Sequence, residues 1–117
     1  MKVEIVFACI PVSDLERSVA WYSQLSDRPP DIVVNPDEVM WKMNEEAWMY
    51  LVVDPDRAGG TSVTISVGDL QRVVAELAGR GVTAGTVQPV GESGHKSTLV
   101  DPDGNAVSLI EVNGGRA

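Results

Sequence analysis

An internal repeat constrains the fold of this chain more than any other feature. Residues 10–20 align with residues 65–75, and seven of the paired positions are identical. In each copy a short apolar segment, 3–12 or 61–67, leads into a stretch whose apolar residues follow helical spacing. Such self-similarity predicts that one strand-helix unit occurs twice in the chain.

Both predicted helices carry boundary signals. Ser13 followed by Glu16 fits a capping box, in which a hydroxyl and a carboxylate accept hydrogen bonds from the free amide groups of the first turn. We therefore expect Ser13 to be the N-cap. Pro29–Pro30 closes the first helical region, and Gly79 or Gly81 can supply the left-handed residue that ends the second helix.

Three strands are predicted after each helix. They cover residues 31–34, 38–43 and 47–53 in the first half, and 83–90, 96–100 and 106–112 in the second. The last two are joined by a strong turn signal at 101–105, where Gly104 can take a positive φ. The chain is thus predicted to be one α+β domain of two tandem βαβββ modules. Their bounds are about 1–54 and 61–112, with a linker at 55–60 and a tail at 113–117.

Charge and composition exclude several classes of function. The 117 residues contain 9 Lys plus Arg and 17 Asp plus Glu, and the net charge of -8 repels phosphate backbones and anionic lipids. We expect neither nucleic-acid nor membrane binding. No apolar run reaches the roughly 20 residues of a membrane span, and the first residues lack a signal peptide's apolar core, so a cytoplasmic protein is expected. The single Cys9 allows no internal disulfide.

The repeat and the late turn together resemble the vicinal oxygen chelate superfamily. This superfamily includes glyoxalase I, extradiol dioxygenases, fosfomycin-resistance enzymes and bleomycin-resistance binding proteins. The resemblance rests on residues 12–18 leading to Trp21 and Tyr22, on 67–70 and on 101–105. It implies that the two modules form a curved mixed sheet around a cavity, which in the enzymes holds a divalent metal.

The resemblance also places the metal-ligand positions of the family on this chain. The first-strand positions fall on Phe7 and Ser62, and the last-strand positions fall on Ser108 and on residues 48–50. None of these side chains is an imidazole or a carboxylate, which a divalent ion prefers. Glu111 follows Ser108 by three residues and is expected on the opposite face of its strand. We predict no cofactor, with a divalent metal at a divergent site as the alternative.

Aromatic residues are confined to the first half of the chain, where strand alternation brings some of them together. Trp21 and Tyr22 fall in the helix and are expected to pack against the sheet. We predict a ligand pocket in which rings face hydroxyl groups. Its predicted residues are Phe7, Cys9, Trp41, Trp48, Tyr50, Ser62 and Ser108. The alternative is that the rings fill the hollow themselves. A lone cysteine such as Cys9 is usually a buried structural thiol, and we expect that here.

The preferred hypothesis is therefore a binding protein without a metal that sequesters an aromatic or cationic small molecule, as a homodimer. One alternative is an enzyme with glyoxalase-, dioxygenase- or isomerase-like activity, which uses a divergent metal site or acid/base chemistry. His95 in the predicted loop 91–96 is the candidate general base, because its unperturbed pKa is near neutrality. Another alternative is a non-catalytic interaction module whose cavity is filled by its own side chains.

Overall fold

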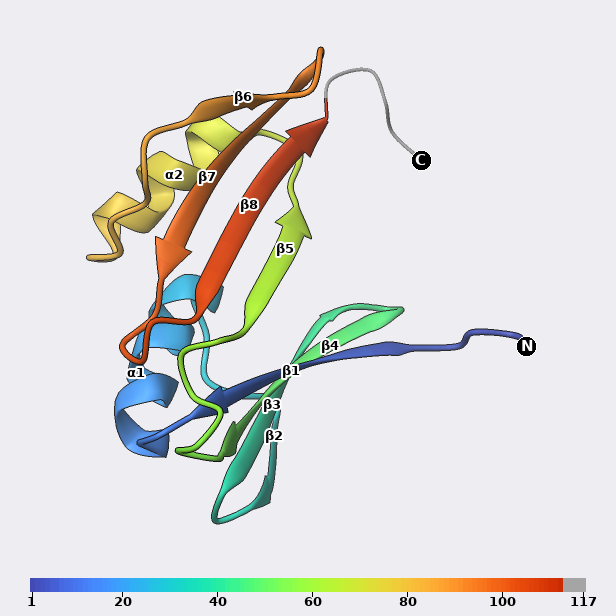
Figure 1. Ribbon diagram of the computed structural model, residues 1–117, viewed down its shortest axis with the longest axis vertical. Helices are drawn as coiled ribbons and strands as arrows, with labels where there is room; N and C mark the ends of the chain where they lie inside the picture. Colours follow the sequence, from blue (N-terminus) through green and yellow to red (C-terminus); the bar gives the residue numbers. More distant parts are fainter. Residues whose placement is uncertain (113–117) are drawn as a thin grey trace.

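Two βαβββ modules follow one another in the computed structural model, which describes residues 1–112 (Figure 1). Module 1 consists of β1 (Val6–Val12), α1 (Leu15–Ser26), β2 (Ile32–Asn35), β3 (Glu38–Asn44) and β4 (Ala47–Val53). Module 2 consists of β5 (Ser62–Ser66), α2 (Leu70–Gly79), β6 (Gln88–Val90), β7 (Gly94–Val100) and β8 (Ala106–Val112). The predicted tail at 113–117 lies outside the described residues.

Each module forms a four-stranded mixed sheet, and the strand order repeats. The order is β1-β4-β3-β2 in sheet A and β5-β8-β7-β6 in sheet B. The first and last strands of each module pair in parallel, and the other pairs are antiparallel. The predicted α+β fold of two βαβββ modules is confirmed. No helix in residues 1–112 is long and apolar enough to span a membrane.

Strand lengths follow the available partners. The predicted first strand began at residue 3, but β1 begins at Val6 because its partner β4 begins at Ala47, directly opposite. The predicted strand 83–90 is reduced to β6. Gly85 instead donates its amide to the Thr98 carbonyl, and the backbones approach so closely there that an added Cβ would lie 2.8 Å from that oxygen. Only Gly fits at this crossing.

Aspartates, not Ser13, cap the helices. Asp14 accepts a hydrogen bond from the amide of Arg17 at the start of α1, and Asp69 accepts one from Arg72 at the start of α2. These residues are equivalent in the repeat. The predicted capping role of Ser13 is therefore wrong. Its amide and hydroxyl both donate to the Asp103 carboxylate in the other module, and this contact removes them from the helix end.

One hydrophobic core joins the two modules. Its most deeply buried large apolar side chains are Trp41, Tyr22, Ile10, Met49, Leu51, Leu70, Leu77 and Leu99. The Tyr22 ring lies 4.7 Å from Trp21 and 6.2 Å from Trp41 between ring centres. Trp21 is partly buried against the same core, so the predicted packing of the two α1 aromatics against the sheet is confirmed.

The turn at 101–105 fastens module 2 to module 1. Asp101 accepts hydrogen bonds from the amides of Asp103 and Asn105, each 2.9 Å long, and Gly104 has a φ of 99°. The Asn105 side chain donates to the Pro11 carbonyl at the end of β1. The predicted turn therefore also sets how the two sheets meet.

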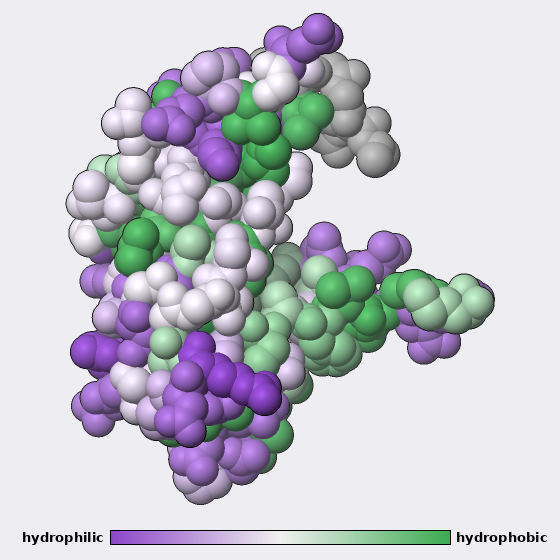
Figure 2. All heavy atoms as spheres, in the orientation of Figure 1, coloured by the Kyte–Doolittle hydropathy of each residue, from purple (hydrophilic) through white to green (hydrophobic). Residues whose placement is uncertain are grey.

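The helices lie on one side of the two sheets, on the left in Figure 1, and leave the other face of each sheet bare. Figure 2 shows a notch between module 2 and the projecting part of module 1, whose surface is largely hydrophobic with hydrophilic side chains along the edge that faces the notch. These bare faces are where the predicted site residues must be sought.

Candidate functional site

Sheet A presents an aromatic face on the side away from α1. The parallel pairing of β1 with β4 places Phe7 beside Trp48 and Cys9 beside Tyr50. Neighbouring Ile10 and Met49 point into the core, so alternation puts these four side chains on the opposite face. The rings of Phe7 and Trp48 are stacked, with centres 6.4 Å apart and planes 24° from parallel. The predicted gathering of these four residues is present in the structure.

Strand β3 adds polar and flexible side chains to this aromatic face. Met40 lies opposite Tyr50, Lys42 opposite Trp48, and Glu38 one pair further along. A hydrogen bond with the Cys9 thiol and partial burial raise the pKa of Tyr50, and the nearby Glu38 carboxylate adds to this. The shift moves the pKa of Tyr50 further from neutral pH, at which a tyrosine phenol is protonated in any case. In the sequence, Glu38 and Lys42 flank three consecutive apolar residues, so the position of Met40 on this face became known only from the strand register.

The aromatic face is open in the single chain. Phe7 is 52% exposed, and Trp48 and Tyr50 are partly buried. Cys9 is an exposed free thiol, so the expected burial of this residue is wrong. The reason is that no element among the described residues covers this side of sheet A.

Trp41 does not join the other predicted ligand residues. It lies opposite Met49 on the core face of sheet A, its exposure is 0%, and its indole nitrogen donates to the Arg28 carbonyl at 3.1 Å. Trp41 is therefore a core residue, and its prediction as a pocket residue is corrected. Strand alternation separates Trp41 from Trp48 because β3 and β4 pair with Lys42 opposite Trp48.

Sheet B presents a hydroxyl face on its bare side. Ser62, Thr64 and Ser66 alternate along β5, and Thr64 lies beside Ser108 on β8. Ser108 in turn lies opposite Thr98, and their hydroxyl oxygens are 3.0 Å apart. The predicted Ser62 and Ser108 thus share a face with further hydroxyl residues, Thr64, Ser66 and Thr98, which were not predicted as site residues. The strict alternation of polar and apolar residues at 62–66 was the signal for Thr64 and Ser66.

His95 and Glu111 point away from the hydroxyl face. His95 lies in β7 rather than in the predicted loop, and it is directly opposite Glu111. Glu111 accepts a hydrogen bond of 2.7 Å from the Leu70 amide at the start of α2, which places it on the helix side as predicted. The candidate general base is therefore not brought together with the predicted ligand residues.

The residues at the family's metal-ligand positions do not fit a divalent ion. Phe7 and Trp48 offer rings that stack on one another, while Ser62 and Ser108 offer neutral hydroxyls. The Ser108 hydroxyl is also engaged by Thr98. Within residues 1–112, no three His, Cys, Asp or Glu side chains come together as a ligand set. Aromatic carbon cannot replace the nitrogen, oxygen or sulfur ligands that such ions require.

No protein-family model matches the chain, and no curated protein matches it either. Solved structures do. A glyoxalase/bleomycin resistance protein from Catenulispora acidiphila is 31% identical, with 92% of this chain and 97% of that one aligned and a TM-score of 0.86.

Two more distant structures show that the fold serves different purposes. An antibiotic-binding protein from a Streptomyces species is 21% identical over 97% of both chains, with a TM-score of 0.74. Lactoylglutathione lyase from Agrobacterium tumefaciens is 17% identical over 95% of both chains, with a TM-score of 0.72. A repeated βαβββ architecture and an identity of 31% to a protein of known family agree, and this chain belongs to the glyoxalase/bleomycin resistance protein family of the vicinal oxygen chelate superfamily.

Proposed function

We propose that this protein binds a flat aromatic or cationic small molecule and holds it without chemical change. The observation that carries the proposal is the exposed, stacked pair of Phe7 and Trp48 on the bare face of sheet A. Flat rings give apolar contact area, and their faces attract cations through the ring quadrupole. Tyr50 beside them supplies a hydroxyl that can orient a polar group of the ligand.

Charge favours a cation over an anion at this face. The chain carries a net charge of -8, and Glu38 lies on the same face as Tyr50. The positive charge of Lys42 is compensated by Glu45, with Nζ 3.3 Å from the carboxylate. A cationic aromatic ligand is therefore attracted both by the chain as a whole and by the local carboxylate.

Binding without conversion is supported by the chemistry that the face lacks. The positions that hold a metal in the family's enzymes carry side chains unsuited to one. The only histidine, His95, points to the other side of sheet B. The antibiotic-binding relative shows that the same fold is used for binding, and we extend that role to this chain.

We further propose that two copies of the chain form the complete site. Large apolar side chains remain exposed near the aromatic face, among them Val3, Ile5, Val6 and Phe7. A group of exposed large apolar side chains of this kind is typical of an interface, and most homo-oligomers are twofold dimers. A second copy would cover these residues and enclose a ligand on the aromatic face.

Native mass spectrometry of the freshly purified protein tests the number of subunits, the absence of a metal and the presence of a bound small molecule. We expect a dimer without metal, with or without a co-purified organic mass. A stoichiometric divalent ion on each subunit would overturn the metal-free proposal and make an enzyme the better description. A monomer at micromolar concentration would overturn the shared site.

A fluorescence titration tests the ligand class. Proflavine is a planar aromatic cation, and it should quench tryptophan emission in a saturable manner. Fluorescein, an aromatic anion, should bind about tenfold more weakly or not at all. The bound proflavine must be recovered unchanged, and equal binding of the two dyes would contradict the predicted preference for cations.

A further inference from the structure

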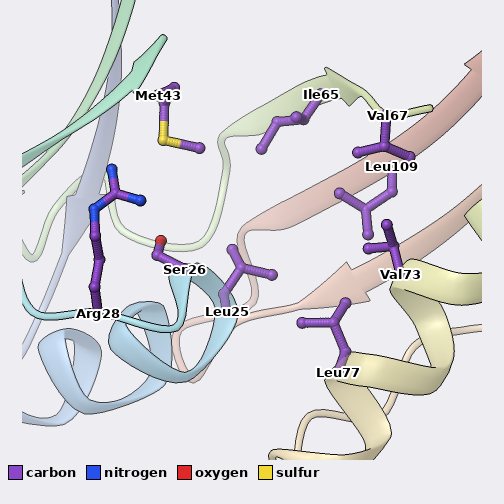
Figure 3. A pocket seen from close by; sticks show the side chains of 9 residues that line it. All are labelled: Leu25, Ser26, Arg28, Met43, Ile65, Val67, Val73, Leu77 and Leu109. Atoms are coloured by element: carbon purple, nitrogen blue, oxygen red, sulfur yellow. The ribbon is translucent and has the colours of Figure 1, made fainter. Parts of the chain in front are cut away.

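We infer a second binding site, for a small neutral aromatic molecule that carries one hydrogen-bond acceptor. It lies in a cleft of about 190 Å³ between the C-terminal end of α1 and helix α2 (Figure 3). None of the residues of the proposed aromatic or hydroxyl faces lines this cleft. It lies on the helix side of the sheets and is therefore independent of the site described above.

The walls of the cleft are apolar and come from both modules. Val67, Val73 and Leu109 line it from module 2, and Leu25 and Met43 line it from module 1. An apolar cavity of roughly 150 Å³ is known to hold one benzene molecule, so this cleft has space for a single ring with a small substituent. This volume corresponds to a ligand of about eight or nine non-hydrogen atoms.

The Arg80 side chain fixes the geometry of the cleft by binding backbone carbonyls at the end of α1. The Arg80 side chain, directly after α2, donates to the carbonyls of Gln24 and Leu25 at 2.7 and 3.0 Å. These bonds tie the last turn of α1 to the end of α2. Because these walls are already held in place, a ligand that enters the cleft loses little binding free energy to ordering them.

Ser26 contributes an unsatisfied polar group to the cleft. Its hydroxyl oxygen is shielded from solvent and has no hydrogen-bond partner among residues 1–112. Figure 3 shows the side chain between Arg28 and Leu25, on the wall of the cleft. Leaving a buried hydroxyl unpaired destabilises the folded chain, and rotation about its Cα–Cβ bond lets a ligand supply the missing partner.

Arg28 supplies hydrogen-bond donors to the cleft as part of an ion pair with Asp31, whose carboxylate balances the charge of the guanidinium. Its Nη2 donates to the Asp31 carboxylate at 3.2 Å and to the Lys42 carbonyl, and no hydrogen bond from Nε or Nη1 to another described residue is found. The Lys42 amide and the Arg28 guanidinium hold the pKa of Asp31 below its usual range, so Asp31 remains ionised and balances Arg28 at neutral pH. These donors favour a neutral carbonyl or hydroxyl oxygen over a carboxylate.

Acetophenone, which has one ring and one carbonyl, is the probe. In a titration followed by methyl NMR, we expect saturable shifts at Leu25, Val67 and Val73. Toluene lacks the acceptor and should bind several-fold more weakly. Benzoate should bind about tenfold more weakly than acetophenone. Shifts confined to residues around Trp48 and Tyr50, or no saturable shift at all, would overturn the proposal.

Substitutions at Ser26 separate this cleft from the aromatic face. Ser26→Leu fills the cleft and removes the hydroxyl, so it should abolish acetophenone binding and raise the melting temperature. Ala20→Leu adds a larger side chain at an exposed position of α1 and should leave binding unchanged. Ser26→Ala should weaken binding several-fold while raising the melting temperature, which keeps the test valid if the leucine variant does not fold.

Two results would exclude a ligand role for the cleft. Unchanged binding in Ser26→Leu would show that acetophenone binds elsewhere. Intermolecular NOEs from a second copy to the Leu25 and Val73 methyls would show that the cleft is filled by protein. Neither result bears on proflavine binding at the aromatic face, so the two proposals fail separately.

Discussion

The Tyr22 hydroxyl donates a 2.8 Å hydrogen bond to the Asp101 carboxylate and so joins α1 of module 1 to the turn that follows β7 in module 2. Both groups are buried, and Asp101 also accepts hydrogen bonds from Asn105 and Asp103. Through this bond the turn at 101–105 helps to hold the two modules in one relative arrangement. The bond also makes the pair a sensitive point for stability.

Replacing Tyr22 by phenylalanine should lower the free energy of unfolding by about 1–3 kcal/mol, because Asp101 loses a buried hydrogen-bond donor. Urea denaturation measures this loss. The matched control is Tyr50→Phe, because it removes a hydroxyl that lies on the open face of sheet A. An equal loss in both variants would contradict a special role for the bond between the modules.

Ionisation of the same residue, Tyr22, should lower the free energy of unfolding at alkaline pH. Burial, followed by the hydrogen bond to Asp101, raises the pKa of Tyr22 well above its ordinary value. A raised pKa means that the folded chain holds the proton more tightly than the unfolded chain. The stabilisation is therefore complete below the ordinary tyrosine pKa of about 10 and is lost as the pH rises above it. Tyr22→Phe should flatten this part of the pH profile of unfolding, and an unchanged profile would contradict the assignment.

Protonation of Asp103 should lower the free energy of unfolding at acid pH. Although its partial burial opposes ionisation, hydrogen bonds from Ser13 and the charge of Arg17 lower the pKa of Asp103. A lowered pKa gives stability above the ordinary aspartate pKa of about 3.9, and this stability is lost as the pH falls through the value in the folded chain. Asp103→Asn should therefore reduce the change in unfolding free energy between pH 6 and pH 3. Asp56→Asn, at an exposed position, should leave it unchanged.

Alanine substitutions of the two tryptophans in the paired strands β3 and β4 should affect different properties, namely stability for Trp41 and ligand binding for Trp48. Trp41 is fully buried, so Trp41→Ala should cost about 3–5 kcal/mol in thermal or urea unfolding. Trp48 lies on the open aromatic face, so Trp48→Ala should cost less stability but weaken proflavine binding about tenfold or more. A large loss of stability with unchanged binding would make Trp48 a core residue.

Cys9 provides a chemical test of the open face. Because its thiol is exposed, it should react with a disulfide reagent such as dithionitrobenzoate without denaturant. Bound proflavine should slow the reaction, since Cys9 lies beside Tyr50 on the aromatic face. A thiol that reacts only in urea, even in dilute solution where a dimer has dissociated, would contradict this placement.

Most of the architecture followed from the sequence. The repeat predicted two βαβββ modules, and the strands 47–53 and 106–112 agree with β4 and β8. Alternation along β1 and β4 correctly placed Phe7 with Cys9 and Trp48 with Tyr50, because successive strand residues always point to opposite faces. These features are local, since they depend only on residue type and spacing.

Which face of each strand is covered was decided by the tertiary structure. The position of Trp41 in the core depends on the register that sets Lys42 opposite Trp48, and the exposure of Cys9 depends on which side of sheet A receives α1. Ser13 lost its expected capping role to a contact with Asp103, 90 residues away. Periodicity determines which side chains share a face, but burial and long-range hydrogen bonds arise only when separate segments pack together, and a single sequence carries no direct record of that packing.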